Sequence, residues 1–192
     1  MRTVWGYDVS STIEPIITEG TFHEITNFAY ANNPRVGAAL AAASQTVRNY
    51  CGWHICPSLT CTANPEGGSR VLTLPAAYVS KINSITENTA AVTDYKLRKD
   101  GLIKRETQWC PEWGAITVNY DAGYEEEAVP DLVEAVCAIT SGVLSVSAGV
   151  ISESADGVSI SYSASASSIA AALTSQQKSA LEPYKVVNSH AA

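Results

Sequence analysis

A helical stripe is the clearest hydrophobic pattern in the chain. Asn33 is a suitable N-cap for it, and Pro34 fits the first helical position because its missing N–H loses no hydrogen bond there. The pattern predicts a helix over about residues 34–50 that ends near Gly52. Its apolar side chains recur at spacings of four, three, four and three residues: Val36, Leu40, Ala43, Val47 and Tyr50.

A second long helix is predicted over about residues 130–149. Pro130 opens it, and Asp131 and Glu134 lie where acidic side chains stabilise the positive end of a helix dipole. Most of the following positions are apolar, so the helix is hydrophobic over most of its circumference. A helix of this kind is buried. We therefore expect it to pack against the helix of residues 34–50 and form the core.

Two capping boxes indicate shorter helices near the ends of the chain. In each, a threonine is followed three residues later by Glu or Gln, at residues 21–24 and 174–177. Such pairs satisfy the free backbone N–H groups at the start of a helix. The first box predicts a helix over about residues 22–30, and the second predicts a helix that runs to about Glu182.

Strand-like patterns are concentrated between about residues 70 and 120. Asp100-Gly101 suits a tight hairpin turn, because both residue types tolerate positive φ. The segments alternate in polarity or are rich in β-branched residues, so they predict a small antiparallel β unit. They are Arg70–Leu74, Tyr78–Thr86, Tyr95–Leu97, Leu102–Lys104 and Ala115–Tyr120.

These elements predict an α+β fold. Its centre is a mainly helical core, a helical bundle, with the small antiparallel β unit inserted and with extended N- and C-terminal arms. Residues 1–19 form the N-terminal arm and residues 20–162 the main domain. Residues 163–192 comprise a Ser/Ala-rich linker, the short C-terminal helix and a polar tail.

Composition narrows the function. The chain has 192 residues, of which 16% are charged, against about 25% in an average soluble domain. Twelve Lys and Arg against nineteen Asp and Glu give a net charge of −7. This balance argues against a protein that grips nucleic acid by neutralising phosphates, but not against one that only surrounds DNA.

The sequence also bears on location. Residues 1–10 lack a basic region followed by an apolar run, so we expect no secretory signal and a protein made in the cytoplasm. The Ala-rich stretch 36–43 is far shorter than the roughly 20 residues of a membrane span. We expect no membrane anchor. Five cysteines, an odd number without an export signal, are expected to be reduced thiols.

Four soft potential metal ligands lie close together in the sequence: Cys51, His54, Cys56 and Cys61. The single residue between His54 and Cys56 fits a tetrahedral zinc site poorly. We instead expect buried thiols beside Trp53 and a hydrogen-bonded structural histidine. The sequence predicts no metal and no cofactor.

Catalytic motifs are missing from the sequence. It contains no Gly-x-Ser-x-Gly, no P-loop and no Gly-x-Gly-x-x-Gly, and its three histidines lie in unrelated contexts;. Glu125, Glu126 and Glu127 form the only charge run, which is typical of a solvated loop that leads into a helix. We expect no enzyme and no catalytic residues. Four tryptophans could line a ligand groove, although core or subunit-interface positions are favoured: Trp5, Trp53, Trp109 and Trp113.

The order of these signals resembles the head-to-tail connector (adaptor) proteins of tailed bacteriophages over about residues 20–186. The N-terminal arm and the Ser/Ala-rich residues 163–172 are not features associated with that family. The segments that carry the resemblance are, in order, Asn33–Val36, Arg48–Ile55, Val71–Pro75, Asp94–Tyr95, Asp100–Ile103, Ile116–Tyr124, Val129–Leu132, Ser152–Ser154 and Asp156–Tyr162.

The resemblance implies a structural virion protein of the neck, assembled in the host cytoplasm. Such a protein forms a homo-oligomeric ring, a dodecamer, beneath the portal and extends the DNA channel. Its partners are the portal protein and a head-closure or tail-completion protein, while DNA passes without sequence-specific binding. The acidic residues Glu125–Glu127 then face the channel or a subunit interface.

Connectors of this family use C-terminal segments to reach the portal. A helix shorter than about 12 residues is marginal alone in water, so the C-terminal helix needs a partner surface. The portal is one candidate, and the other is the chain's own subunit. The predicted portal-docking residues are Thr174, Leu181, Tyr184, Val186 and Val187.

Two other classes of function stay open at the level of sequence. One is a secreted or surface β-rich binding module, suggested by the four tryptophans and the Ser/Thr content. The other is a hydrolase that acts through the loop of Glu125–Glu127.

Overall fold

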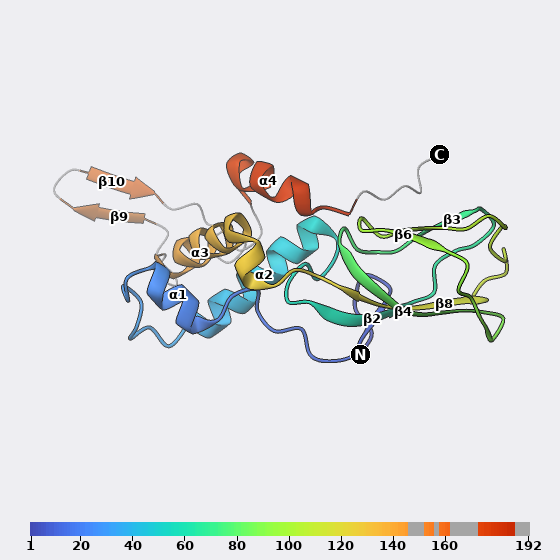
Figure 1. The fold of residues 1–192 in the computed structure, drawn as a ribbon. Helices are drawn as coiled ribbons and strands as arrows, with labels where there is room; N and C mark the ends of the chain where they lie inside the picture. Colours follow the sequence, from blue (N-terminus) through green and yellow to red (C-terminus); the bar gives the residue numbers. More distant parts are fainter. Residues whose placement is uncertain (146–151, 156–157, 162–172, 187–192) are drawn as a thin grey trace. The chain divides into compact units, whose positions relative to one another are not determined.

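The computed structural model describes residues 1–145, 152–155, 158–161 and 173–186 (Figure 1). The chain divides into two compact units. The sheet unit consists of the described residues of Met1–Glu14, Arg48–Ala128 and Pro183–Ala192. The helical unit consists of those of Pro15–Val47 and Val129–Glu182.

A five-stranded antiparallel sheet dominates the sheet unit, with the order β1-β2-β8-β4-β5. Its central strand β8 alternates strictly in burial, because even-numbered residues from Ile116 to Ala122 face the core and odd-numbered ones do not. This confirms the alternation predicted for this segment. The strands are β1 (Asp8–Val9), β2 (Leu59–Ala63), β4 (Val79–Glu87), β5 (Ala90–Ala91) and β8 (Ile116–Ala122).

A second, three-stranded antiparallel sheet has the order β3-β7-β6. It comprises β3 (Val71–Thr73), β6 (Lys96–Arg98) and β7 (Leu102–Lys104). Leu72 and Ile103 pair across this sheet and are fully buried. The β6–β7 hairpin closes through a bond from Gly101 N–H to Arg98 O (3.0 Å). Gly101 has φ 86°, which makes glycine the favoured residue at this turn.

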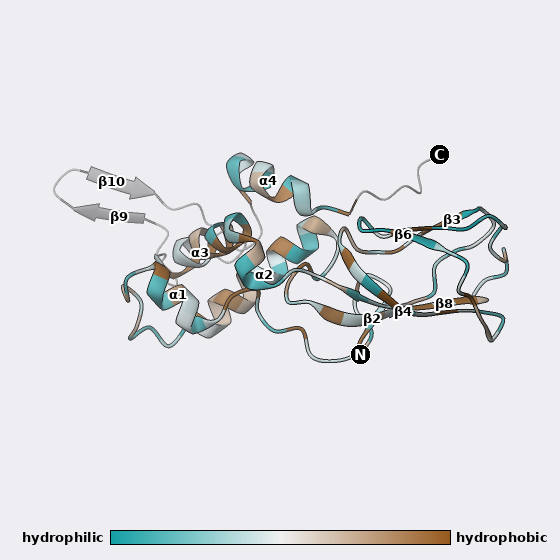
Figure 2. Cartoon of the chain, in the orientation of Figure 1, coloured by the Kyte–Doolittle hydropathy of each residue, from teal (hydrophilic) through white to brown (hydrophobic). Residues whose placement is uncertain are grey.

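The helical unit contains α1 (Glu19–Ile25), most of α2 (Val36–Cys51), α3 (Pro130–Ser145) and α4 (Ser175–Leu181). Four positions of the predicted α2 stripe are buried: Val36, Leu40, Ala43 and Val47. Hydrophobic residues are visible on both α2 and α3 in Figure 2. Seven residues of α3 are buried. None of the helices that the structure describes is long and apolar enough to cross a membrane.

Helix α1 begins three residues earlier than the predicted start at residue 22. Thr18 is its N-cap and accepts a hydrogen bond from Thr21 N–H (3.1 Å). The predicted capping box had placed Thr21 in that role, but its hydroxyl bonds to Thr18 Oγ1 (3.0 Å). The helix ends before Asn27 and Phe28, whose φ values of 49° and 58° are incompatible with a right-handed helix;.

The predicted fold class, a mainly helical bundle with a small β insert, is wrong. The part of the chain that the structure describes has four α-helices and, besides a hairpin of β9 (Ser152–Ala155) and β10 (Val158–Ser161), two antiparallel sheets of five and three strands. Its largest fully buried side chains belong to the sheet unit: Trp53, Trp109, Tyr7 and Tyr120. The fold is therefore mixed α+β with a sheet-rich core.

The physical reason lies in the shortness of the missed strands. β1 and β5 have two residues each, too few to show any periodicity. β2 alternates only weakly, since Thr and Cys occupy its middle positions. Residues 146–149 of the second predicted helix and the insert 163–172 lie outside the described residues.

Candidate functional site

The predicted docking residues are all placed except Val187, which lies outside the described range. Thr174 caps α4 in the predicted capping box, accepting from Gln177 N–H (3.2 Å) while Gln177 Oε1 accepts from Thr174 N–H (2.8 Å). Leu181 is fully buried, and α4 contacts α3 within the helical unit. The short helix thus has a partner surface in its own chain.

Residues 183–186 continue the C-terminal segment within the sheet unit. The Tyr184 carbonyl accepts from Trp53 Nε1–H (2.6 Å), and the Tyr184 ring lies edge-on to Tyr124 at 5.7 Å between centroids. Val186 N–H donates to Cys51 O (3.0 Å). These contacts hold Tyr184 and Val186 on their own chain. Portal docking by the segment stays a prediction.

The three glutamates of the acidic loop lie around the short 3-10 helix η1 (Glu126–Ala128). Glu125 and Glu127 are exposed, and Glu126 is half-buried. The two ion pairs found among the described residues involve other side chains. The loop therefore presents negative charge at the surface, as the sequence predicted for a solvated loop.

A buried polar cluster surrounds Arg48. The Arg48 guanidinium donates to three backbone carbonyls, those of Glu14 (2.5 Å), Cys56 (2.6 Å) and His54 (2.9 Å). Burial lowers the pKa of Arg48 to about 10, so it stays charged at neutral pH. Burial also raises the pKa of the Cys56 thiol to about 11; Arg48 opposes this rise, and the acidic loop adds to it.

Arg48 stabilises a strained turn at Ile55. The bond from Cys56 N–H to His54 O (2.8 Å) closes a three-residue turn around Ile55, which has φ 63°. Positive φ is costly for a β-branched residue. Because the carbonyls of both His54 and Cys56 accept from Arg48, the guanidinium holds this turn in place. Sequence reasoning missed this role.

His54 is fully buried, with both ring nitrogens occupied. Nε2 lies 3.0 Å from Ala122 O and Nδ1 lies 2.8 Å from the Tyr7 hydroxyl. A carbonyl can only accept, so Nε2 carries the proton and Nδ1 accepts from Tyr7. Burial lowers the pKa of His54 to about 4. The prediction of a hydrogen-bonded structural histidine is confirmed.

The five cysteines are divided between the two units, with Cys137 in the helical unit and the other four in the sheet unit. Cys51, Cys56 and Cys61 are buried, as is Cys137 in α3, and Cys110 is half-buried. Among the residues that the structure describes, no group of three or more His, Cys, Asp or Glu side chains is arranged to hold a metal ion.

The four tryptophans have different environments. Trp53 and Trp109 are fully buried, and Trp5 is half-buried against the Tyr7 ring. Trp113, in contrast, is 89% exposed. Two of the four therefore belong to the core, as the favoured interpretation of the sequence predicted, while Trp113 is a surface residue.

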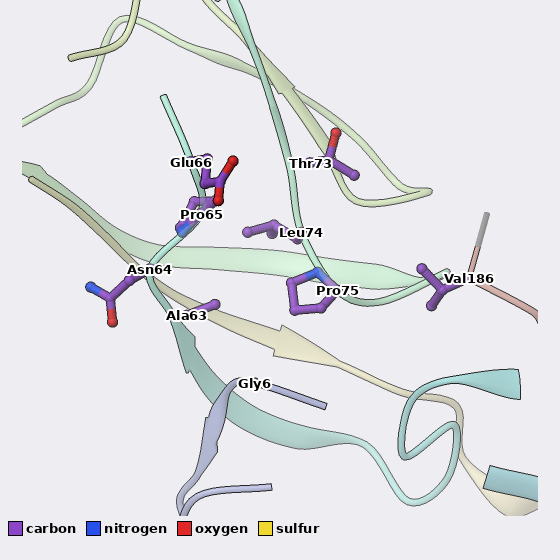
Figure 3. Close-up of a pocket in the computed structure, with 9 residues that line it drawn as sticks. All are labelled: Gly6, Ala63, Asn64, Pro65, Glu66, Thr73, Leu74, Pro75 and Val186. Carbon is purple, nitrogen blue, oxygen red and sulfur yellow. The ribbon is translucent and has the colours of Figure 1, made fainter. Parts of the chain in front are cut away.

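Two surface pockets lie within the sheet unit. The first, drawn in Figure 3, has a volume of about 200 Å³ and extends from Gly6 past Asn64 to Leu74, Pro75 and Val186. The second has a volume of about 350 Å³ and combines apolar side chains with three charged ones, Arg98, Asp100 and Lys185. Val186 lines both pockets, so the end of the described chain is part of their walls.

Chains of similar fold occur among solved structures of gene transfer agent particles. A chain from the neck of an empty particle with C6 symmetry has a TM-score of 0.63 at 16% identity. A chain from the neck of a native particle with C12 symmetry has a TM-score of 0.59 at 14% identity. Each alignment covers 97% of this chain and 98% of the other. At these identities the likeness establishes the fold alone.

A third such chain, from the virion of the native particle, gives a TM-score of 0.61 at 15% identity. No curated protein matches this chain.

The buried polar groups described above bond within their own chain, as expected of a structural subunit. The model of the head completion protein family matches residues 15–187. The chain therefore belongs to the head completion protein family. This confirms the resemblance to phage head-to-tail connectors and, with it, the predicted class of function, a structural protein that connects head and tail.

Proposed function

We propose that the protein is a ring-forming subunit of the virion neck, located between the portal and the tail or its completion proteins. The observation that carries this proposal is the family match over residues 15–187. The fold supports it, because the similar solved chains come from necks with C12 and C6 symmetry. Twelve copies around the portal axis would extend the DNA channel.

The charge of the chain fits this role. Its net charge of −7 repels the phosphates of a passing genome, which favours sliding over binding. The exposed carboxylates of Glu125 and Glu127 would contribute to this repulsion if the acidic loop faces the channel. If it faces a neighbouring subunit, they would meet a basic surface there.

We further propose a non-catalytic mode of action. His54 is fully buried and uses both ring nitrogens in hydrogen bonds, so it is not available to transfer protons. The Cys56 and Cys61 thiols have pKa values raised by burial, which disfavours the reactive thiolate. Assembly contacts, rather than chemistry, are then the function of the chain.

The test is a particle preparation made without this protein. We expect DNA-filled heads that fail to join tails and that regain joining when the purified protein is added. Electron microscopy of the restored particles should show added density below the portal, in the same number of copies as the portal subunits. Normal tail joining by particles that lack the protein would contradict the proposed function.

A further inference from the structure

We propose that neighbouring copies join through Trp113, whose indole enters the 350 Å³ pocket of the next copy. This inference rests on the proposed function, because it supplies the contact that closes a ring.

Trp113 is held on an ordered turn. Ala115 N–H donates to Glu112 O (3.2 Å), and Gly114 has φ 77°. Glycine is favoured at such a position because it adopts positive φ without strain. The turn therefore fixes the backbone on both sides of an indole that is 89% exposed.

The loop that carries this turn is tied to β4 by an ion pair between the buried Arg105 and the half-buried Glu87. One nitrogen of Arg105 bonds to both carboxylate oxygens of Glu87 (2.7 and 2.9 Å) and to Gln108 O (2.6 Å). The same guanidinium stacks over the Trp109 ring at 3.9 Å, and Cys110 N–H donates to Glu87 (2.6 Å). Trp113 is thus preorganised, which lowers the entropy lost on binding.

An exposed tryptophan on a rigid loop is typical of an interface anchor. Tryptophan is enriched among the residues that contribute most to binding, and such residues enter well-packed pockets on the partner. Removing the large apolar surface of an indole from water is favourable in free energy. Trp53 and Trp109 obtain this stabilisation by burial in their own chain, whereas Trp113 does not.

The pocket matches this anchor in size and charge. Its volume of about 350 Å³ is within the range of sites that hold small aromatic ligands. Its lining includes the apolar side chains of Leu74, Ala76, Ala77 and Leu102 and the cationic side chains of Arg98 and Lys185. Asp100 also lines it and is paired with Arg98 (2.5 Å), and the Lys185 ammonium lies over the Tyr50 ring of its own chain (4.8 Å to the centroid), so these three side chains carry a formal charge of +1. Cations favour an indole face and the neighbouring carboxylate of Glu112.

Anchor and pocket lie at opposite ends of the strands. The Trp113 turn immediately precedes Ile116, the first residue of β8. Tyr124 lies just beyond the other end of β8, and its ring stacks on the Tyr78 ring at 4.6 Å between centroids. Tyr78 directly follows the pocket residue Ala77 in the sequence, so the pocket lies near that other end. A strand of this length spans about 20 Å. Trp113 therefore cannot fill the pocket of its own chain.

This separation points to a second copy as the occupant. When one surface carries the anchor and a different surface carries its pocket, copies associate head to tail, and a rotation that closes gives a ring. Both halves are present on every copy, so no other protein is required.

The test uses two variants that each disable one half of the contact. Trp113→Ala removes the anchor, and Ala77→Phe fills the pocket. The matched control is Val4→Ser, which changes another exposed apolar residue of the sheet unit (82% exposed). Self-association is measured by sedimentation velocity or, where the purified wild type is monomeric, as cross-linked copies on portal-bearing heads.

We expect each variant alone to weaken self-association by about 30-fold or more, as for an interface hot spot, and Val4→Ser to behave as wild type. A mixture of the two variants should give dimers and nothing larger, because the anchor of Ala77→Phe copies still fits the pocket of Trp113→Ala copies. Circular dichroism melts of all variants check folding.

The proposal is overturned if Trp113→Ala associates as the wild type does, or if the mixture forms no dimers. Normal rings of Trp113→Ala that fail to bind heads would instead assign Trp113 to another neck protein. Failure of the proposed function looks different: wild-type protein then forms no ring in solution or on heads, and its removal leaves tail joining unchanged.

Discussion

The Tyr7 hydroxyl makes two hydrogen bonds at one buried place. It donates to His54 Nδ1 (2.8 Å) and accepts from His54 N–H (3.0 Å). Tyr7→Phe would leave both groups without partners where water does not reach them. We expect a loss of about 1–3 kcal/mol in the free energy of unfolding, measured by urea denaturation. Tyr78→Phe is the control, and equal stability of the two variants would contradict the assignment.

The same histidine makes stability depend on pH. Burial lowers the pKa of His54 from 6.5 to about 4 in the folded state. The unfolded chain therefore binds a proton more readily than the folded chain between these values, and stability rises with pH across that window. The stabilisation is fully present above pH 6.5 and is lost as pH falls toward 4. The size of the effect is about 3 kcal/mol.

His54→Gln tests this pH dependence. A glutamine does not titrate, so the variant should lose the part of the slope that arises between pH 4 and 6.5. His23→Gln serves as the control histidine. Free energies of unfolding at several pH values check the prediction, and an unchanged slope in His54→Gln would refute it.

For single residues, the sequence indicated the kind of structural role more readily than the bonding partners or the degree of burial. The structural role of His54 was predicted because the ligand spacing around it disfavoured a zinc site. Its partners could not be predicted, since Ala122 lies 68 residues away and nothing local marks Tyr7. The sequence favoured core or subunit-interface positions for the tryptophans but could not assign each one: Trp109 and Trp113 look alike in sequence. Trp109 is the buried one, stacked beneath the Arg105 guanidinium that pairs with Glu87.

At the scale of elements, predictability followed the length of the periodic pattern. The stripe of α2 extends over four turns and was found with its start within two residues. β8, with seven alternating residues, was also found. Two-residue strands carry no period at all, so β1 and β5 depend entirely on pairing with distant partners. The fold class failed because several such strands were left out.

Helix α3 gives a test at this scale. Val136 is fully buried and Ala138, two residues later, is exposed. Val136→Asp would place an unpaired charge in the core, which costs several kcal/mol, so we expect loss of soluble, cooperatively folding protein. Ala138→Asp puts the same side chain on the same helix in water and should fold normally. A cooperative, undiminished melt of Val136→Asp would exclude a central role for α3.

At the scale of the whole molecule, neither unit is continuous in sequence. The sheet unit draws on three separate segments and the helical unit on two. A sequence pattern divides a chain where its composition changes and so yields contiguous domains. Which segments share a unit depends on contacts such as Trp53 with Tyr184, separated by 131 residues. The family could still be inferred, because it depends on the order of the segments and not on their arrangement in space.

The C-terminus offers two truncations that separate internal packing from docking. Deletion of residues 174–192 removes the buried Leu181 and the Trp53–Tyr184 bond. Deletion of residues 187–192 leaves every contact described above intact. If docking depends on the last six residues, the short deletion keeps the wild-type melting temperature and fails to bind portal-bearing heads.

The long deletion then both melts at a lower temperature and fails to bind heads. Its stability falls because losing a buried leucine alone costs about 2–5 kcal/mol. If the segment serves only its own subunit, the short deletion binds heads normally, and the long deletion binds them in proportion to the fraction that remains folded. Thermal melts and counts of protein retained on heads, taken on the same samples, distinguish these outcomes. Normal head binding by both truncated proteins would end the docking prediction for Thr174–Val187.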